Sequence, residues 1–140
     1  MGNEYLNEIV EEAWFCKRPV DNPALKYIAN HVGIVVKTNK GHKWLIHNAC
    51  NKERNEYGIY VTDSKNMSNR WKYEPIPVLR KGVTISTCQR VMGLKGHEFQ
   101  DWLDAQICIG AAQKLKLYLG MEEGIDSLQV GYGFFYDLLI

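Results

Sequence analysis

The feature that most constrains this chain is a pair of apolar segments separated by a short turn signal. Residues 31–37 (HVGIVVK) are rich in β-branched side chains, which favour extended structure. Residues 39–41 (NKG) supply the Asn and Gly typical of a tight turn, and residues 43–47 (KWLIH) form a second apolar run. The sequence therefore predicts an antiparallel hairpin. His31 would open its first strand and His47 would close its second, so pairing would bring both histidines to one end of the hairpin.

The segments before and after this hairpin predict further helices and strands. Residues 4–15 carry apolar side chains at helical spacing and predict an N-terminal helix, which residues 17–23 (KRPVDNP) would end. Residues 57–63 (YGIYVTD) predict a third strand, and residues 75–79 are expected to be extended. A short helical turn is expected at residues 24–29.

The C-terminal half predicts two helices and a closing segment. Ser86, with Gln89 three positions later, resembles a capping box that opens a short helix, and Gly93 would help to end it. Residues 98–119 are strongly apolar at helical spacing, with a possible break at Gly110 inside them. The aromatic tail, residues 129–140, is expected to be a strand or a buried closing segment.

Length and composition indicate one globular unit. The chain has 140 residues, of which 46% are hydrophobic and 24% are charged, which is ordinary for a globular protein. Two domains of this total length would each have a small core. The order of the predicted elements, helix then strands then helices, indicates a single α+β domain over residues 1–140, with an antiparallel sheet packed against helices.

Charge and hydropathy exclude several classes of partner. The net charge is +1 and no basic stripe is visible, which argues against a nucleic-acid partner. The apolar stretches are far shorter than the roughly 18 residues of a membrane span. The N-terminus lacks the basic start and apolar run of a signal peptide. We therefore expect a cytoplasmic protein whose four cysteines are reduced thiols, while the oligomeric state stays open.

Two histidines and one cysteine form the candidate catalytic pattern. Two imidazoles at one end of a hairpin suit a base and a residue that orients it. Cys108 lies among small and apolar residues that could begin a helix, and a helix N-terminus lowers the pKa of a thiol and offers N–H groups to an oxyanion. A histidine at a strand end is nevertheless more often a solvated side chain, and a cysteine among apolar residues is more often an inert core thiol.

The hairpin resembles that of a known superfamily. Residues 31–36 (HVGIVV) and 44–48 (WLIHN) are similar to the histidine hairpin of the circularly permuted NlpC/P60 papain-like superfamily, which includes lecithin:retinol acyltransferase and its relatives. The likeness spans roughly residues 17–117. Its other parts are residues 17–20 (KRPV), residues 61–68 (VTDSKNMS) with Trp71, and residues 81–86 (KGVTIS).

The resemblance implies a permuted papain-like fold and a thiol enzyme. Carried over to this sequence, Cys108 is the nucleophile, His31 is the base, and His47 orients the imidazole of His31. Such an enzyme is a hydrolase or acyltransferase that attacks an amide, ester or thioester carbonyl and forms an acyl-enzyme. Its substrate would be a small-molecule, peptide or lipid acyl compound, and no cofactor is needed.

Three alternatives stay open from the sequence. Ile107 and Ile109 flank Cys108 with apolar side chains, which favours a catalytically inactive interaction or binding module on the same fold. Cys88 is a second candidate nucleophile, although core packing is the better interpretation of a cysteine on a short amphipathic helix. A zinc site built from His42, His47 and Cys50 is disfavoured, because the hairpin supplies at most three ligands.

Overall fold

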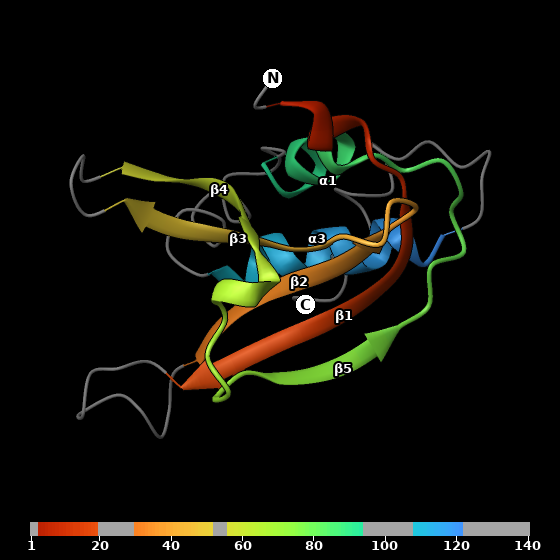
Figure 1. Ribbon diagram of the computed structural model, residues 1–140. Coiled ribbons are helices and arrows are strands. Elements are labelled where there is room, and N and C mark those ends of the chain that lie inside the picture. The colour runs from red at the N-terminus through yellow and green to blue at the C-terminus, as the bar shows by residue number, and fades with distance from the viewer. Residues whose placement is uncertain (1–2, 20–29, 52–55, 94–107, 122–140) are drawn as a thin grey trace.

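A computed structural model describes residues 3–19, 30–51, 56–93 and 108–121 of the chain. Within these residues the protein is α+β, with one five-stranded sheet in the order β4-β3-β2-β1-β5 and all neighbouring strands antiparallel (Figure 1). The strands are β1 (Val10–Pro19), β2 (Asn30–Thr38), β3 (Lys43–Asn51), β4 (Glu56–Asp63) and β5 (Lys72–Ile76). The helices are α1 (Ile85–Met92) and α3 (Cys108–Leu119), with short 3-10 turns η1 (Glu4–Asn7) and η2 (Ser64–Asn66).

The predicted hairpin is confirmed as β2 and β3. Ile34 lies opposite Ile46 and Lys37 lies opposite Lys43, and Gly41 occupies the turn with a positive φ of 79° that suits glycine. The second strand is longer than expected, because β3 continues past His47 and pairs with β4 as far as Asn51. The third predicted strand is also confirmed, as β4.

The predicted N-terminal helix over residues 4–15 is wrong. Only η1 is helical, and β1 takes the rest of the segment as a strand that pairs with β2 on one side and β5 on the other. The side chains of β1 contact apolar groups on both faces of the sheet: Phe15 packs with the helix-side core, while Trp14 and Cys16 pack on the opposite face. A strand that is buried on both faces loses its alternating pattern, and its apolar residues then mimic helical spacing.

Both described helices cover one face of the sheet. In Figure 1, α3 lies behind β2 and β3, and its residues Ala111 and Leu115 are buried with the β2 residues Val32 and Ile34. The side chains of residues 32, 34 and 36 point to this face, so the helix side holds the larger core.

The helix predictions are confirmed in part. α1 forms where expected and ends at Gly93, but its cap is Thr84, whose hydroxyl accepts a hydrogen bond from the Thr87 N–H at 3.2 Å, so Ser86 lies inside the helix. α3 runs from Cys108 through Gly110 without a break. The expected extended segment begins earlier, as β5.

Other predicted segments, residues 24–29, 98–107 and 129–140, lie outside the described residues. Among the helices that the structure describes, none combines the length and the apolar character needed to cross a membrane.

Candidate functional site

The face of the sheet opposite the helices is partly covered by the connection from β4 to β5. These two strands are the opposite edges of the sheet, so the chain after β4 must cross β3, β2 and β1 before it can pair as β5. Figure 1 shows η2 and the following turn on the near side of the sheet, away from α3. The crossing buries Trp71 against Cys16, Val35 and Leu45, and Met67 packs at the border of this small cluster.

A cleft of about 440 Å³ opens beside this cluster. Its polar lining comes from separate parts of the chain: Arg18 of β1, His47 of β3, Thr62 of β4, and Asn66, Ser68 and Arg70 of the crossing. Its apolar lining consists of Leu45, Met67 and Trp71. A concave site with an apolar floor and a few polar groups is typical of a ligand-binding site.

His47 is held in the cleft by a close approach of β2 and β3. Gly33 lies across from it on β2, and a Cβ atom at position 33 would be 3.0 Å from the His47 Cβ and 2.8 Å from Leu45 Cδ1. Burial lowers the pKa of His47 to about 4, and the positive charges of His31 and Arg18 add to that lowering. His47 is therefore a neutral imidazole at neutral pH, with one N–H donor and one acceptor nitrogen.

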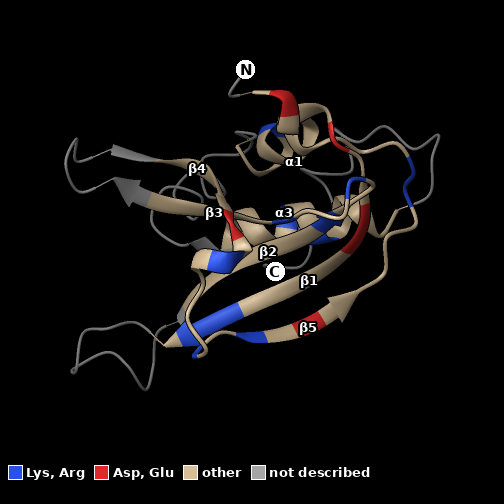
Figure 2. Ribbon diagram, in the orientation of Figure 1, with Lys and Arg blue, Asp and Glu red and all other residues tan. Residues whose placement is uncertain are grey.

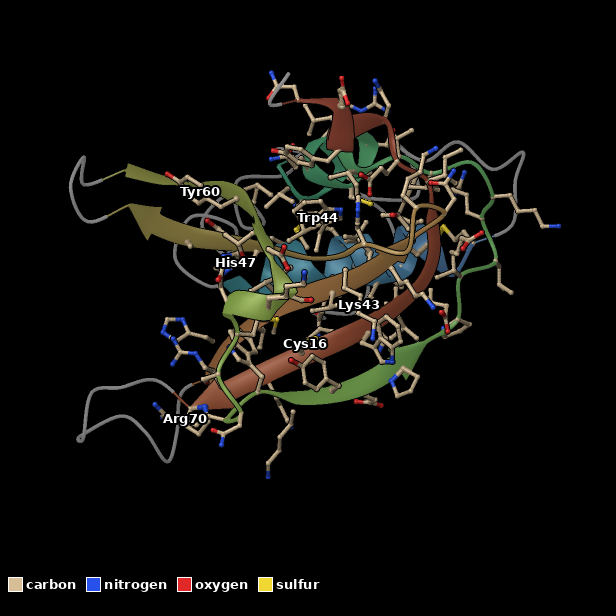
Figure 3. All side chains as sticks on the ribbon, in the orientation of Figure 1. Cys16, Lys43, Trp44, His47, Tyr60 and Arg70 are labelled. Atoms are coloured by element: carbon tan, nitrogen blue, oxygen red, sulfur yellow. The ribbon has the colours of Figure 1, made fainter. Side chains whose placement is uncertain are left out.

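Two guanidinium groups converge at the rim of the cleft. Arg18 Nη1 and Arg70 Nη2 both donate hydrogen bonds to the Pro19 carbonyl oxygen, at 3.2 Å and 3.3 Å. The Arg18 guanidinium also lies 5.4 Å from the centre of the Trp71 ring, as a cation–π contact. Figure 3 shows His47 and Arg70 at the same end of the sheet, with Cys16 farther along β1. The rim thus gathers positive charge above an aromatic floor.

The structure brings the two predicted histidines together but places the helix of Cys108 elsewhere. His31 and His47 lie on adjacent antiparallel strands, and the alternation of side chains puts both on the face that carries Val35 and Leu45. α3, whose described part includes Cys108, packs against the other face of the sheet. The side chain of Cys108 lies outside the described residues.

The two cysteines with described side chains are free and buried. Burial raises the pKa of Cys16 to about 12, and it raises the pKa of Cys88 to the same value. Both thiols are therefore protonated at neutral pH and are poor nucleophiles, as expected for packed core residues.

The two histidines considered as zinc ligands, His42 and His47, lie in different parts of the structure. His42 lies at the β2–β3 turn, where its Nδ1 is 2.8 Å from Glu8 Oε2, while His47 faces the cleft. The Cys50 side chain lies outside the described residues. Within the described part of the chain, no three His, Cys, Asp or Glu side chains converge as a metal site would require.

The sequence analysis did not predict the two arginines at the rim of the cleft, Arg18 and Arg70. It also did not predict that His31 and His47 lie on the face of the sheet opposite the helices. The signal for the face is present in β2, since Val32, Ile34 and Val36 are more apolar than the alternate positions that include His31, and the more apolar side packs against the helices. No local pattern in the sequence indicates that the Arg18 and Arg70 side chains lie close together. The two residues meet at the Pro19 carbonyl oxygen only because the connection from β4 to β5 crosses the sheet.

Comparisons with known proteins find one distant similarity. The chain is 26% identical over 112 residues to an uncharacterised protein of Acanthamoeba polyphaga mimivirus, and the match covers 79% of this chain and 93% of that protein. No family model matches the chain, and no solved structure matches it. Because that protein is uncharacterised, the similarity indicates no activity for this chain.

Proposed function

We propose that this protein is a non-catalytic binding module whose ligand site is the cleft on the helix-free face of the sheet. The observation that carries the proposal is the convergence of Arg18, His47 and Arg70 over an apolar floor of Leu45, Met67 and Trp71. Six side chains from three separate segments of the chain thereby form one concave surface with both polar and apolar parts.

Catalysis by the predicted Cys–His–His set is less well supported. A general base must lie within hydrogen-bond reach of the thiol whose proton it takes, or one water away. His31 and His47 face the cleft side, whereas α3 packs on the other side of the sheet. Cys16 and Cys88 cannot replace Cys108, because both thiols are buried with a pKa of about 12.

The test is ligand binding by matched variants. A panel of small anionic, neutral and cationic metabolites is screened by thermal shift against the wild type, Arg70→Gln and Lys65→Gln. Lys65 is exposed on η2 and does not line the cleft, so it controls for the loss of one nearby charge. We expect at least one panel member to raise the Tm of the wild type and of Lys65→Gln, with a smaller effect on Arg70→Gln. A panel without any stabilising member, or stabilisation that is equal in all three proteins, contradicts the proposal.

A second candidate is the cysteine-dependent hydrolase or acyltransferase on a permuted papain-like fold. Two observations favour it: the α+β architecture has an antiparallel sheet packed against helices, and Cys108 lies on one of the helices, α3. In this reading Cys108 is the nucleophile, His31 the base and His47 the orienting residue.

Iodoacetamide labelling at neutral pH, read by peptide mass spectrometry, separates the two candidates. The enzyme requires one fast-reacting thiol at Cys108, and loss of acyl-ester turnover in Cys108→Ala. The binding module requires four uniformly slow thiols. A cytoplasmic location and a small-molecule partner remain proposals from the sequence.

A further inference from the structure

The two strands beneath the cleft contribute neutral polar side chains to it. Thr62 of β4 lies directly opposite Leu45 of β3, and His47 is two residues further along β3, so all three side chains are on the helix-free face. Residues 44–49 of β3 and 58–62 of β4 contain no Lys, Arg, Asp or Glu. Figure 2 shows the basic residues of this corner at the end of β1, in η2 and at the start of β5. The wall that β3 and β4 give to the cleft is therefore polar without being charged.

Asn66 is a further neutral group, which the crossing connection adds to the cleft. It is the last residue of η2, whose cap is Asp63: the Asp63 carboxylate accepts the Lys65 N–H at 2.9 Å. On the other side of Asn66, the Met67 N–H donates to the Ser64 carbonyl oxygen at 3.0 Å. These two bonds fix the backbone around Asn66, so little ordering is required there when a ligand binds.

The side chains of His47, Thr62 and Asn66 are available to a ligand. Within the part of the chain that the structure describes, none of the three side chains forms a hydrogen bond to another residue. Burial lowers the pKa of His47 to about 4, so its neutral imidazole offers one N–H donor and one acceptor nitrogen. The Thr62 hydroxyl and the Asn66 amide each offer a donor and an acceptor as well. A ligand of complementary chemistry is uncharged and carries both kinds of group.

The arginines at the rim have hydrogen-bond partners inside the protein. Arg18 Nη1 and Arg70 Nη2 donate to the Pro19 carbonyl oxygen, and the Arg18 guanidinium lies 5.4 Å from the centre of the Trp71 ring. The Arg70 N–H donates to Ser68 Oγ at 3.3 Å. These contacts make the two arginines part of the wall of the cleft.

The floor of the cleft favours a ligand with apolar faces. Leu45 and Trp71 are buried at its base, and Met67 is half-buried beside them. The volume of about 440 Å³ lies within the range of small-molecule sites, about 300–1,000 Å³. A planar heterocycle meets both requirements, because its faces are apolar and its edge is polar.

From these observations we infer that the cleft binds a neutral planar heterocycle whose edge carries both hydrogen-bond donors and acceptors, as a nucleobase does. The faces of the ring lie against the apolar floor, and the edge exchanges hydrogen bonds with His47, Thr62 and Asn66. An asparagine amide is suited to such an edge, since it pairs with adenine through two hydrogen bonds in protein–DNA complexes. This inference rests on the proposed binding function and adds the chemical class of the ligand.

The experiment is an amide NMR titration of the full chain with adenine, uracil and indole. Indole shares the two-ring shape of adenine but has a single N–H donor and no acceptor nitrogen, so it measures what the polar edge contributes. We expect adenine or uracil to bind more tightly than indole. The amide signals of His47 and of residues 62–71 should shift on binding.

Substitutions at two exposed positions test the hydrogen bonds directly. Asn66→Ala and Thr62→Val should each weaken the binding of the base by about 5-fold, which corresponds to the net contribution of one hydrogen bond. Asn69→Ala is the matched control, because Asn69 is an exposed asparagine on the same crossing that does not line the cleft. It should change the affinity by less than about 2-fold.

A pair of substitutions at His47 tests the half-buried position. Gln keeps a donor and an acceptor, whereas Leu is similar in size and has neither. We therefore expect His47→Leu to bind the base about 5-fold more weakly than His47→Gln does. If His47→Leu does not fold, the variants at the exposed residues Asn66 and Thr62 decide the test.

Three results overturn the inference alone: no binding of either base, indole that binds as tightly as both bases, or base binding that is unchanged in Asn66→Ala and Thr62→Val. In each case a member of the metabolite panel whose binding depends on Arg70 leaves the binding function standing. If no panel member binds and Cys108 labels fast with iodoacetamide, both the inference and the binding function fail.

Discussion

Replacing Glu8 with Ala removes the acceptor at the centre of a polar cluster that ties the N-terminal segment to the β2–β3 turn. The Glu8 carboxylate is buried, with a relative exposure of 9%. It accepts hydrogen bonds from Thr38 Oγ1 at 2.7 Å and from Trp44 Nε1 at 3.0 Å, and its Oε2 is 2.8 Å from His42 Nδ1. In addition, the Asn39 side chain accepts the Ile9 N–H at 3.0 Å, so the turn and the N-terminal segment are joined at two points.

The size of the effect follows from how far water can replace each lost bond. A buried donor left without its acceptor costs about 1–3 kcal/mol. Thr38 is almost fully buried and Trp44 is half-buried, whereas the side chain of His42 is 56% exposed and can bind water instead. We therefore expect Glu8→Ala to lower the free energy of unfolding by about 2–4 kcal/mol, mostly through Thr38 and Trp44.

The matched control is Glu12→Ala on β1. Glu12 is 3.6 Å from Lys37 Nζ, and both side chains are more than one-third exposed, so this ion pair contributes about 0–1 kcal/mol. Urea denaturation followed by tryptophan fluorescence measures both variants against the wild type. Equal stabilities of Glu8→Ala and Glu12→Ala would refute the argument that the buried carboxylate organises the cluster.

The same cluster predicts a pH dependence. Burial raises the pKa of the Glu8 carboxyl, but the hydrogen bonds from Thr38, Trp44 and His42 and the charge of His42 outweigh it, so the pKa lies below its ordinary value. The stability gained from this lowered pKa is fully present above the unfolded value of about 4.3, and it is lost as the pH falls through the folded value. The difference in Tm between the wild type and Glu8→Gln should therefore shrink below about pH 4. A difference that stays constant in that range would contradict this account.

Three further outcomes test the cleft and the core. Gly33→Ala should cost about 1–3 kcal/mol in urea denaturation, because its Cβ would lie 2.8 Å from Leu45 Cδ1 and 3.1 Å from the Ile46 carbonyl oxygen; an unchanged midpoint would argue against that close approach. Cys16 and Cys88 should resist iodoacetamide at neutral pH in the folded protein and react in urea, and rapid labelling of either in the folded state would contradict their burial. The pKa of His47 is lowered to about 4 from an unfolded value of about 6.5, so its contribution to stability is complete above about pH 6.5 and is lost as the pH falls toward 4. In His47→Gln, the Tm should therefore depend less on pH between about 4 and 6.5, and a Tm profile identical to that of the wild type would contradict this account.

The sequence alone determined the parts of the fold that depend on neighbours along the chain. The β2–β3 hairpin follows from β-branched residues on both sides of an Asn-Lys-Gly turn, and both its strands and its turn were predicted. The third strand and α1 were also predicted. Each of these elements carries its own signal, since turn chemistry, capping and side-chain branching act over only a few residues.

Tertiary structure decided the rest, because it depends on contacts that no local pattern encodes. Residues 10–15 form a strand, and not the predicted helix, because β1 pairs with strands on both sides and is packed on both faces. The alternation along β2 and β3 puts His31 and His47 on one face, and the packing of the sheet decided that α3 covers the opposite face. Arg18 and Arg70 meet only because the edge positions of β4 and β5 force the chain to cross the sheet between them.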